Sequence, residues 1–298
     1  KPVDVRVSTY PTQYGEKVVM RILDQSKGLV GLDKMGFEPD TIKLWKEAYT
    51  SGNGIVLVTG PTGSGKSTTL YATLTRVNTV EEHIITIEDP VERQLDGIIQ
   101  GHVNERAGMT FAAALRSMLR QDPDVIMVGE MRDRETADLA IRAALTGHLV
   151  FSTLHTNSAS ASYTRLVDMG CDPFLLTTTI RAILAQRLIR KLCYKCKVKY
   201  KPTEKDLKSL GVDKIDGFIY HSNSNGCKTC GKDGYKGRAG IYELLIPNEA
   251  INEAVKNEAS AEEVGRIAAE NKMKTLQQAA LNYVLRGETS VEEINRVL

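Results

Sequence analysis

The residues with the clearest chemistry form a glycine-rich stretch, Gly-Pro-Thr-Gly-Ser-Gly-Lys-Ser, that begins at position 60. It fits the pattern G-x-x-x-x-G-K-[ST], in which backbone N–H groups turn inward around a triphosphate. The apolar residues 55–59 before it predict a buried strand, and residues 67–77 predict a helix whose N-terminus favours an anion. We therefore expect Lys66 to contact the β- and γ-phosphates and the Ser67 hydroxyl to bind Mg²⁺. The predicted nucleotide-binding residues of this stretch are Gly60, Pro61, Thr62, Gly63, Ser64, Gly65, Lys66, Ser67 and Thr68.

Hydrolysis of a bound triphosphate also needs a carboxylate, and one follows the apolar residues 125–128. This run resembles a Walker B strand and places Glu130 at its carboxyl end, where open α/β sheets bind ligands. The aspartate that usually precedes the glutamate is replaced by Gly129. Mg²⁺ would then be held by Ser67, phosphates, waters and either Glu130 or a carboxylate near Glu88. The alternative for Glu130 is a surface residue that begins a helix.

Three further carboxylates, Glu88, Asp89 and Glu92, directly follow the strand predicted over residues 83–87. This strand is expected beside the strand that precedes the glycine-rich loop, so the group can orient water or hydrated Mg²⁺. An exposed acidic turn is the alternative explanation for the same composition.

Two histidines, His148 and His155, flank the apolar strand predicted over residues 149–154. Histidine can act as a general acid or base near neutral pH. A histidine at a strand end is more often a packed or solvated residue, so the residues alone leave both roles open.

Arginines recur along the predicted core. Phosphoryl transfer needs positively charged side chains that contact the transferred phosphoryl group. Solvated helix faces and structural ion pairs are the alternative for any single arginine. For the set, we expect at least one to contact phosphate. The candidates are Arg116, Arg120, Arg132, Arg165 and Arg238.

Two C-x-x-C pairs, Cys193 with Cys196 and Cys227 with Cys230, are separated by 30 residues. Four thiolates can form a closed tetrahedral shell around Zn²⁺, which predicts a structural metal site that folds a polar segment. An iron–sulfur cluster or a redox function is less consistent with the sequence, since no thioredoxin-like βαβ unit surrounds either pair. The fifth cysteine, Cys171, is expected to be buried.

The composition is that of an ordinary globular protein with room for two domains. Its 298 residues are 42% hydrophobic and 26% charged, and the formal net charge of +2 gives no electrostatic basis for binding nucleic acid. No apolar run approaches the roughly 18 residues of a membrane span, and no signal-peptide pattern is present. We expect a cytosolic protein that makes no nucleic-acid contact.

Alternating strands and helices predict an α/β fold with a mainly parallel, helix-covered sheet. Strands predicted over residues 3–8 and 18–23 are interpreted as the end of an N-terminal domain whose front is missing. Leu176, Ile180 and Leu184 predict one stripe of an amphipathic helix that continues to Leu188. The predicted organisation is residues 1–27 from the N-terminal domain, 28–46 a linker, 47–191 the nucleotide-binding core, 192–237 a tetracysteine module and 238–298 a strand with a helical subdomain.

Four ordered motifs together resemble a known family. They are residues 60–71, residues 87–92, residues 119–133 and residues 146–157. These resemble the Walker A motif, Asp box, Walker B motif and His box of the type II secretion and type IV pilus assembly ATPases, the GspE/PilB group. The match covers essentially the whole chain.

The resemblance implies a RecA-like ATPase core that assembles as a homo-hexamer and uses ATP, Mg²⁺ and Zn²⁺. ATP hydrolysis would drive an inner-membrane platform protein of the PilC or GspF type, and the missing N-terminal region would contact other inner-membrane components. It makes Glu130 the catalytic glutamate, Glu88 a second acidic residue, and both His148 and His155 site residues. Such a protein is cytoplasmic and peripherally associated with the inner membrane.

The resemblance also implies that arginines at Arg6 and Arg21 reach the nucleotide from the N-terminal domain, and that the five core arginines act within or between subunits. The four cysteines match the zinc module of extension ATPases, which retraction ATPases generally lack. Ser162 and Tyr163 stand where the family usually has smaller residues, which concerns local packing. Two other functions stay open from the residues: a nucleic-acid-dependent RecA-like translocase and a regulatory nucleotide-binding module without turnover.

Overall fold

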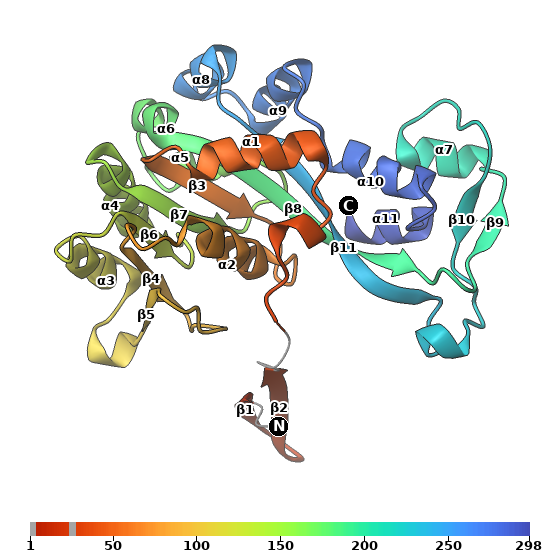
Figure 1. Cartoon of the computed structure of the whole chain (residues 1–298), viewed down its shortest axis with the longest axis horizontal. Coiled ribbons are helices and arrows are strands. Elements are labelled where there is room, and N and C mark those ends of the chain that lie inside the picture. Colours follow the sequence, from red (N-terminus) through yellow and green to blue (C-terminus); the bar gives the residue numbers. More distant parts are fainter. Residues whose placement is uncertain (1–3, 24–27) are drawn as a thin grey trace.

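A seven-stranded sheet forms the centre of the computed structural model, which describes residues 4–23 and 28–298 (Figure 1). Its strand order is β11-β8-β3-β7-β6-β4-β5, and all neighbours pair in parallel except β11, which runs antiparallel to β8. The predicted α/β fold is confirmed. The strands are β3 Gly54–Thr59, β4 Ile84–Glu88, β5 Ile99–His102, β6 Val125–Val128, β7 Leu149–Leu154, β8 Ile180–Leu192 and β11 Tyr235–Leu245.

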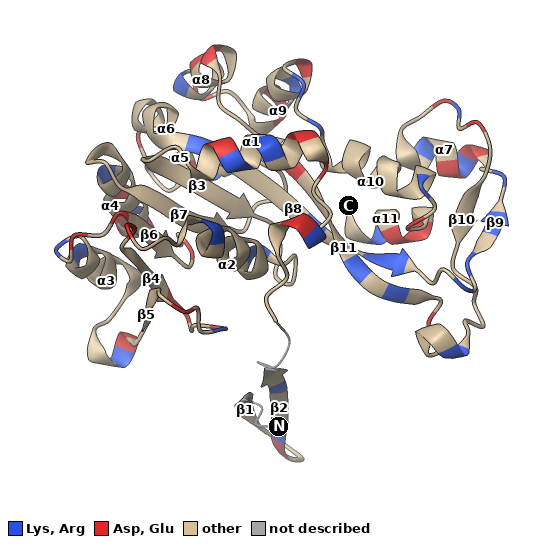
Figure 2. Ribbon diagram, in the orientation of Figure 1, with Lys and Arg blue, Asp and Glu red and all other residues tan. Residues whose placement is uncertain are grey.

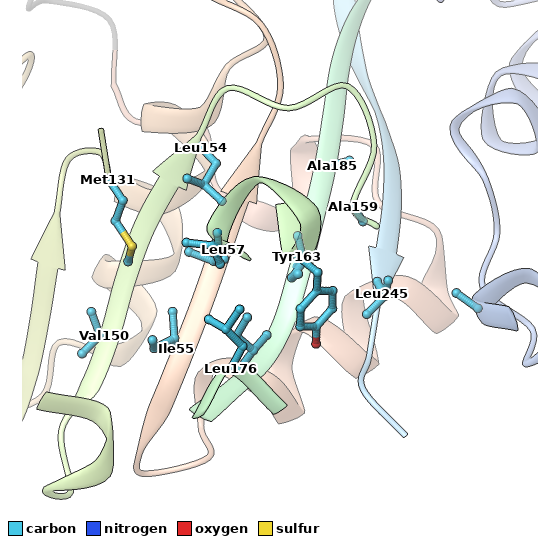
Figure 3. Close-up of a cluster of buried hydrophobic side chains, with 14 of the residues drawn as sticks. Ile55, Leu57, Met131, Val150, Leu154, Ala159, Tyr163, Leu176, Ala185 and Leu245 are labelled. Carbon is cyan, nitrogen blue, oxygen red and sulfur yellow. The ribbon is translucent and has the colours of Figure 1, made fainter. Parts of the chain in front are cut away.

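Helices cover both faces of this sheet, because β3 is apolar on both sides. Ile55 and Leu57 belong to one buried cluster, whereas the alternate residues Val56 and Val58 belong to the other. The first cluster is drawn in Figure 3, where Tyr163 and Leu176 pack from the helices onto the sheet. Its helices include α3 Phe111–Met118, α4 Arg134–Leu145, α5 Ala161–Asp168 and α6 Pro173–Thr179; the second cluster packs under α1 Pro39–Tyr49 and α2 Lys66–Val77.

The prediction of a helix that continues to Leu188 is wrong beyond Thr179. From Ile180 the chain is β8, which lies between β3 and β11. The apolar residues used for the prediction are four apart, but a run of apolar residues is also typical of a strand buried on both faces, and here Ile183 belongs to one buried cluster and Leu184 to the other. Hydrogen bonds to both neighbouring strands show that this segment is a strand and not a helix.

The edge strand β5 was not predicted, because its sequence Ile-Gln-Gly-His has no apolar alternation. Ile99 is 58% exposed, as expected for an edge. The strands predicted at 83–87, 125–128 and 149–154 and the helix at 134–145 are confirmed within one residue at each end.

The N-terminal strands form a two-stranded antiparallel hairpin, β1 Asp4–Thr12 and β2 Gly15–Leu23. Both predicted strands lie in it, although the first predicted residue, Val3, falls outside the described residues. Figure 1 shows the hairpin projecting from the body. After a 3₁₀ turn, Leu32–Lys34, α1 packs on the sheet through Trp45, whose Nε1 donates to Thr73 Oγ1 at 3.1 Å.

The C-terminal third continues from β8 into the cysteine-rich segment and then into helices. A small ribbon pairs β9 Val198–Tyr200 with β10 Ile219–His221, and α7 Glu204–Leu210 connects them. None of the helices in the described residues has the length and apolar character to span a bilayer. The last helices are α8 Glu249–Lys256, α9 Ala261–Glu270, α10 Leu276–Leu285 and α11 Val291–Val297.

Candidate active site

The predicted nucleotide residues surround a cavity of about 420 Å³ at the carboxyl ends of the parallel strands. Parallel packing brings these ends to one edge, so loops distant in sequence meet there. Most of the predicted cradle and both acidic loops contribute to its wall. The predicted residues that line it are Thr62, Gly63, Gly65, Lys66, Ser67, Thr68, Glu88, Asp89, Glu92, Glu130, His155 and Arg238.

The glycine-rich loop has the backbone of a phosphate cradle. Gly60 and Gly65 have positive φ angles of 146° and 90°, and a Cβ at Gly60 would lie 2.5 Å from the Gln186 carbonyl oxygen. Lys66 begins α2, and its ammonium group donates to the Gly60 carbonyl at 2.8 Å. Burial lowers the pKa of Lys66, although the carboxylate of Glu130 opposes this effect. A phosphate would replace neutral carbonyls as the partner of this ammonium group.

Glu130 follows the carboxyl end of β6 and lies between two basic side chains. Its carboxylate is 2.5 Å from Arg132 Nη2 and 3.5 Å from His155 Nε2. Burial and the charge of Lys66 lower the pKa of His155, so this imidazole is neutral near pH 7. Glu130 itself is 17% exposed and faces the cavity, which places an ionisable oxygen near the predicted phosphates.

Glu88 is buried and receives three hydrogen bonds. Thr86 Oγ1 donates at 2.6 Å, Gln100 Nε2 donates at 3.1 Å, and the Tyr71 hydroxyl also donates. Burial and the hydrogen bond to Glu88 raise the pKa of Tyr71, which keeps the phenol protonated as a donor. The Tyr71 oxygen in turn accepts from the Glu92 N–H at 3.1 Å. The network fixes the carboxylate of Glu88 at the cavity wall.

Gly129, where an aspartate is usual, lies against the neighbouring strand. A Cβ there would be 3.2 Å from the Ile87 carbonyl oxygen and 3.3 Å from Glu88 Cα. These distances are shorter than ordinary van der Waals contacts, so a larger residue would displace β4 and Glu88. The absence of a side chain at this position therefore allows the close approach of β4 and β6.

Other predicted residues lie outside the cavity. His148 is at the amino end of β7, where its Nδ1 is 2.9 Å from the Ala143 carbonyl oxygen, and the 6 residues of β7 separate it from His155 by about 23 Å. It cannot contact the same phosphate group as His155 within one chain. Arg132 pairs with Glu130 at the cavity rim. Arg116 on α3, which pairs with Glu135, is also outside the cavity, and so are the exposed Arg120 and the exposed Arg165 on α5. The hairpin residues Arg6 and Arg21 are outside as well, and they lie directly opposite each other.

The four predicted cysteine ligands come together in a second candidate site. Their sulfur atoms all lie within 4.8 Å of one another, and Cys193 and Cys227 are 3.7 Å apart. Four thiolates about 2.3 Å from Zn²⁺ in a tetrahedron would be about 3.8 Å apart, so the arrangement fits this ion. The N–H of Cys227 lowers the pKa of Cys230 to about 6, which favours the thiolate that binds metal. Cys171 is buried away from this cluster, as predicted.

A family model described as Type II/IV secretion system protein matches residues 1–296. The chain belongs to this family. The type II secretion system protein E of Pseudomonas aeruginosa is 49% identical over 297 residues, which cover 100% of this chain and 59% of that protein. The type IV pilus assembly ATPase PilB of Thermus thermophilus is 48% identical over 294 residues, which cover 98% of this chain and 33% of that protein. The chain thus spans less than two thirds of these relatives.

Two solved structures share this fold. The pilus retraction motor PilT, solved with bound ADP, has a TM-score of 0.68 and 30% identity, with 97% of this chain and 76% of that chain covered. The Legionella pneumophila ATPase DotB has a TM-score of 0.70 over 99% of this chain and 72% of that chain, and at 24% identity it supports the fold alone.

Several buried residues that hold the site of this family member lie outside the predicted set. Gln186 on β8 donates to the Ser64 carbonyl at 2.7 Å and accepts from Thr69 Oγ1 at 2.8 Å. Arg187 donates to the Asn157 carbonyl at 2.8 Å, and Glu243 accepts from the Ala159 N–H at 2.8 Å. The family's four motifs do not include these residues, and they act on loops far away in sequence. A buried polar residue in an apolar strand was the available signal.

The unusual Ser162 fits its surroundings. Its hydroxyl is buried and lies 2.8 Å from Thr156 Oγ1, which is in turn bonded to Thr59. This chain of hydroxyl groups joins the end of β3 to the loop after β7. Tyr163 fills the apolar core beside it (Figure 3).

Proposed function

We propose that this chain is the motor portion of a hexameric ATPase that powers the assembly of type IV pili or type II secretion pseudopili. The observation that carries the proposal is the convergence of the phosphate cradle, Glu130 and Glu88 on one cavity. The family membership and the relatives named for secretion and pilus assembly support the choice of biological process.

In the proposed reaction, the loop that begins at Gly60 binds the phosphates through its N–H groups, and Lys66 neutralises the β- and γ-phosphates. Glu130 positions and deprotonates the attacking water, while neutral His155 holds the Glu130 carboxylate toward the cavity. Mg²⁺, held by Ser67 and Glu130, would neutralise charge on the phosphates. Glu88, fixed by its three donors, gives the second acidic oxygen that orients water.

The finer parts of the proposal concern assembly. We assign the interval 1–27 to an N-terminal domain, 28–46 to a linker, and Zn²⁺ to the four cysteines as a structural ion. The chain would work at the cytoplasmic face of the inner membrane on a platform protein, without nucleic acid. Residues predicted at the nucleotide that lie outside the cavity would act after the hairpin closes or across a subunit boundary: Arg6, Arg21, Arg116, Arg120, His148 and Arg165.

Substitution of Glu130 by Gln tests the enzyme function. The amide keeps the size of the side chain but cannot take a proton, so Mg-ATP binding should persist while phosphate release falls at least about 100-fold. Phosphate release and nucleotide binding are measured on the same samples. Glu47→Gln, which changes an exposed carboxylate on α1, is the matched control and should behave as the unmodified chain. Equal turnover in the Glu130 and Glu47 variants would refute the role of Glu130 in hydrolysis.

A further inference from the structure

A second cavity, of about 380 Å³, lies on the other side of the tip of the phosphate-binding loop. It shares Thr62, Gly63, Leu188 and Arg238 with the first cavity and then extends toward the C-terminal helix α11. The tip of the loop therefore forms a wall common to both cavities, and the mechanism proposed above does not use the second one.

Four guanidinium groups line this second cavity, and none of its described lining residues is acidic. Arg187 is 7% exposed, and the partners of its guanidinium are the neutral carbonyl oxygens of Gln186 and Asn157. Figure 2 shows basic residues along β11 and the adjoining end of β8. The other three arginines are Arg190, Arg238 and Arg296.

One buried carboxylate pairs with two of these arginines, and the exposed Asp233 lies 3.9 Å from Arg190 Nη1. Glu293 on α11 accepts from Arg190 Nη2 at 2.8 Å and from Arg296 Nη2 at 2.6 Å. Arg190 also stacks over the Tyr235 ring, with 4.1 Å between the guanidinium carbon and the ring centroid. Glu243 also acts on Arg187 through its charge, so four guanidinium groups face three carboxylates, and the cavity keeps a net positive charge on side chains that are already held in place.

Ser64 gives a second, independent indication of a ligand. Its residue is 3% exposed and lines the cavity, yet its hydroxyl has no hydrogen-bond partner among the residues that the structure describes. A buried hydroxyl without a partner costs free energy, and an anion in the cavity would accept a hydrogen bond from it.

We propose that this cavity, the arginine pocket, binds a phosphate-sized anion at a site separate from the nucleotide phosphates. Guanidinium groups present paired donors that match phosphate oxygens, and the Ser64 hydroxyl adds one more. The anion is free orthophosphate or the phosphate group of a small ester. Its binding requires no hydrolysis, so it can be tested independently of the proposed function.

The test measures binding of radiolabelled orthophosphate by equilibrium dialysis to the chain saturated with a non-hydrolysable ATP analogue and Mg²⁺. The analogue occupies the phosphate cradle, so remaining phosphate binding reports the arginine pocket. We expect saturable binding with about one phosphate per chain. Arg296→Gln should weaken it about tenfold, which corresponds to about 1.4 kcal/mol. Unlabelled AMP that displaces the label more effectively than unlabelled phosphate would identify an ester as the source, and the reverse would identify free phosphate.

Two further variants separate loss of phosphate binding from loss of folding. Ser64→Ala leaves the contacts of Glu293 intact and should also weaken phosphate binding. Arg286→Gln removes an exposed arginine paired with Glu288 and should leave binding unchanged. Thermal unfolding of each variant is compared with the unmodified chain. Absence of phosphate binding to the analogue-loaded chain, or equal affinity in all three variants, would overturn the proposal and indicate an adventitious ion only.

Discussion

The carboxylate of Glu88 shows how single residues in this site are held. Its donors Tyr71 and Gln100 come from α2 and β5, 17 and 12 residues away along the chain. The sequence motif predicts Glu88 because it directly follows a strand. It cannot predict the donors, because the contacts arise from the register of β4 with β5 and from the packing of α2 on the sheet.

Replacing Tyr71 by Phe removes one donor from Glu88 and keeps the ring. A hydrogen bond to a charged group contributes about 1.5–3 kcal/mol, so we expect kcat to fall about tenfold or more as Glu88 loses its fixed orientation. KM for ATP should change little, because Tyr71 does not belong to the phosphate cradle. Steady-state ATPase kinetics measure both constants. Tyr14→Phe, a 91% exposed tyrosine on the hairpin turn, is the control, and a rise in KM with kcat unchanged would contradict the prediction.

The strand β8 connects the nucleotide-binding core to the C-terminal third of the chain, and its sequence is compatible with both a strand and a helix. Neighbouring residues such as Ile183 and Leu184 belong to the buried clusters on opposite faces of the sheet, and a fully buried strand cannot be told from a buried helix by periodicity alone. The motif-bearing strands β6 and β7 were predicted at their observed bounds, because apolar runs of 4 and 6 residues between polar loops are too short for a buried helix.

The contact of α11 with β8 should depend on pH through Glu293. Burial alone would raise the pKa of this carboxyl group, but hydrogen bonds from Arg296 and Arg190 lower the pKa to about 2. A lowered pKa in the folded state gives stability that is complete above the unfolded value near 4.5 and is lost as the pH falls toward 2. The melting temperature of Glu293→Gln should therefore be below that of the unmodified chain at pH 7, and the difference should shrink between pH 5 and pH 3.

Glu292→Gln, the exposed neighbouring carboxylate, serves as the control for this measurement and should melt within about 1 °C of the unmodified chain. A difference between the Glu293 variant and the unmodified chain that stays constant from pH 7 to pH 3 would show that the ion pairs do not carry the stability.

At the scale of the whole molecule, the hairpin of β1 and β2 exposes an apolar surface that its own two strands cannot cover. Val7, Tyr10, Met20 and Ile22 are each more than half exposed. The motifs predicted the nucleotide cavity, since the carboxyl ends of parallel strands must meet. The motifs could not predict where the hairpin lies relative to the nucleotide cavity, because no motif specifies the path of a linker.

Substitution of both Arg6 and Arg21 by Ala tests whether the hairpin closes over the nucleotide. The two residues are cross-strand partners, so their side chains lie on the same face of the hairpin. We expect ATP binding to remain measurable and most turnover to be lost, because the two guanidinium groups no longer stabilise the negative charge of the transferred phosphate. Lys17→Ala, an exposed cation on the same hairpin, is the control. Unchanged turnover in the double variant would argue against closure.

Removal of metal tests the tetracysteine module. The intact protein should contain about one Zn²⁺ per chain by elemental analysis, and Cys196→Ser should lose it while Cys171→Ser retains it. Loss of the ion should increase amide hydrogen exchange across residues 193–237, because this polar segment has little core of its own. Zinc-free protein with unchanged exchange in this segment would exclude a structural role for the metal.

The length of β8 has a mechanical consequence. Its 13 residues span about 40 Å, and Gln186 within it holds the Ser64 carbonyl of the phosphate-binding loop, while its end at Leu192 is followed directly by Cys193. From Gln186 to Leu192 the strand pairs with β11 alone, since its pairing with β3 ends at Ala185. An extended chain has little slack, so a displacement of the cysteine cluster along this segment would pull on the strand that holds the phosphate-binding loop. The metal-binding end and the phosphate cradle are thus joined by a single continuous strand.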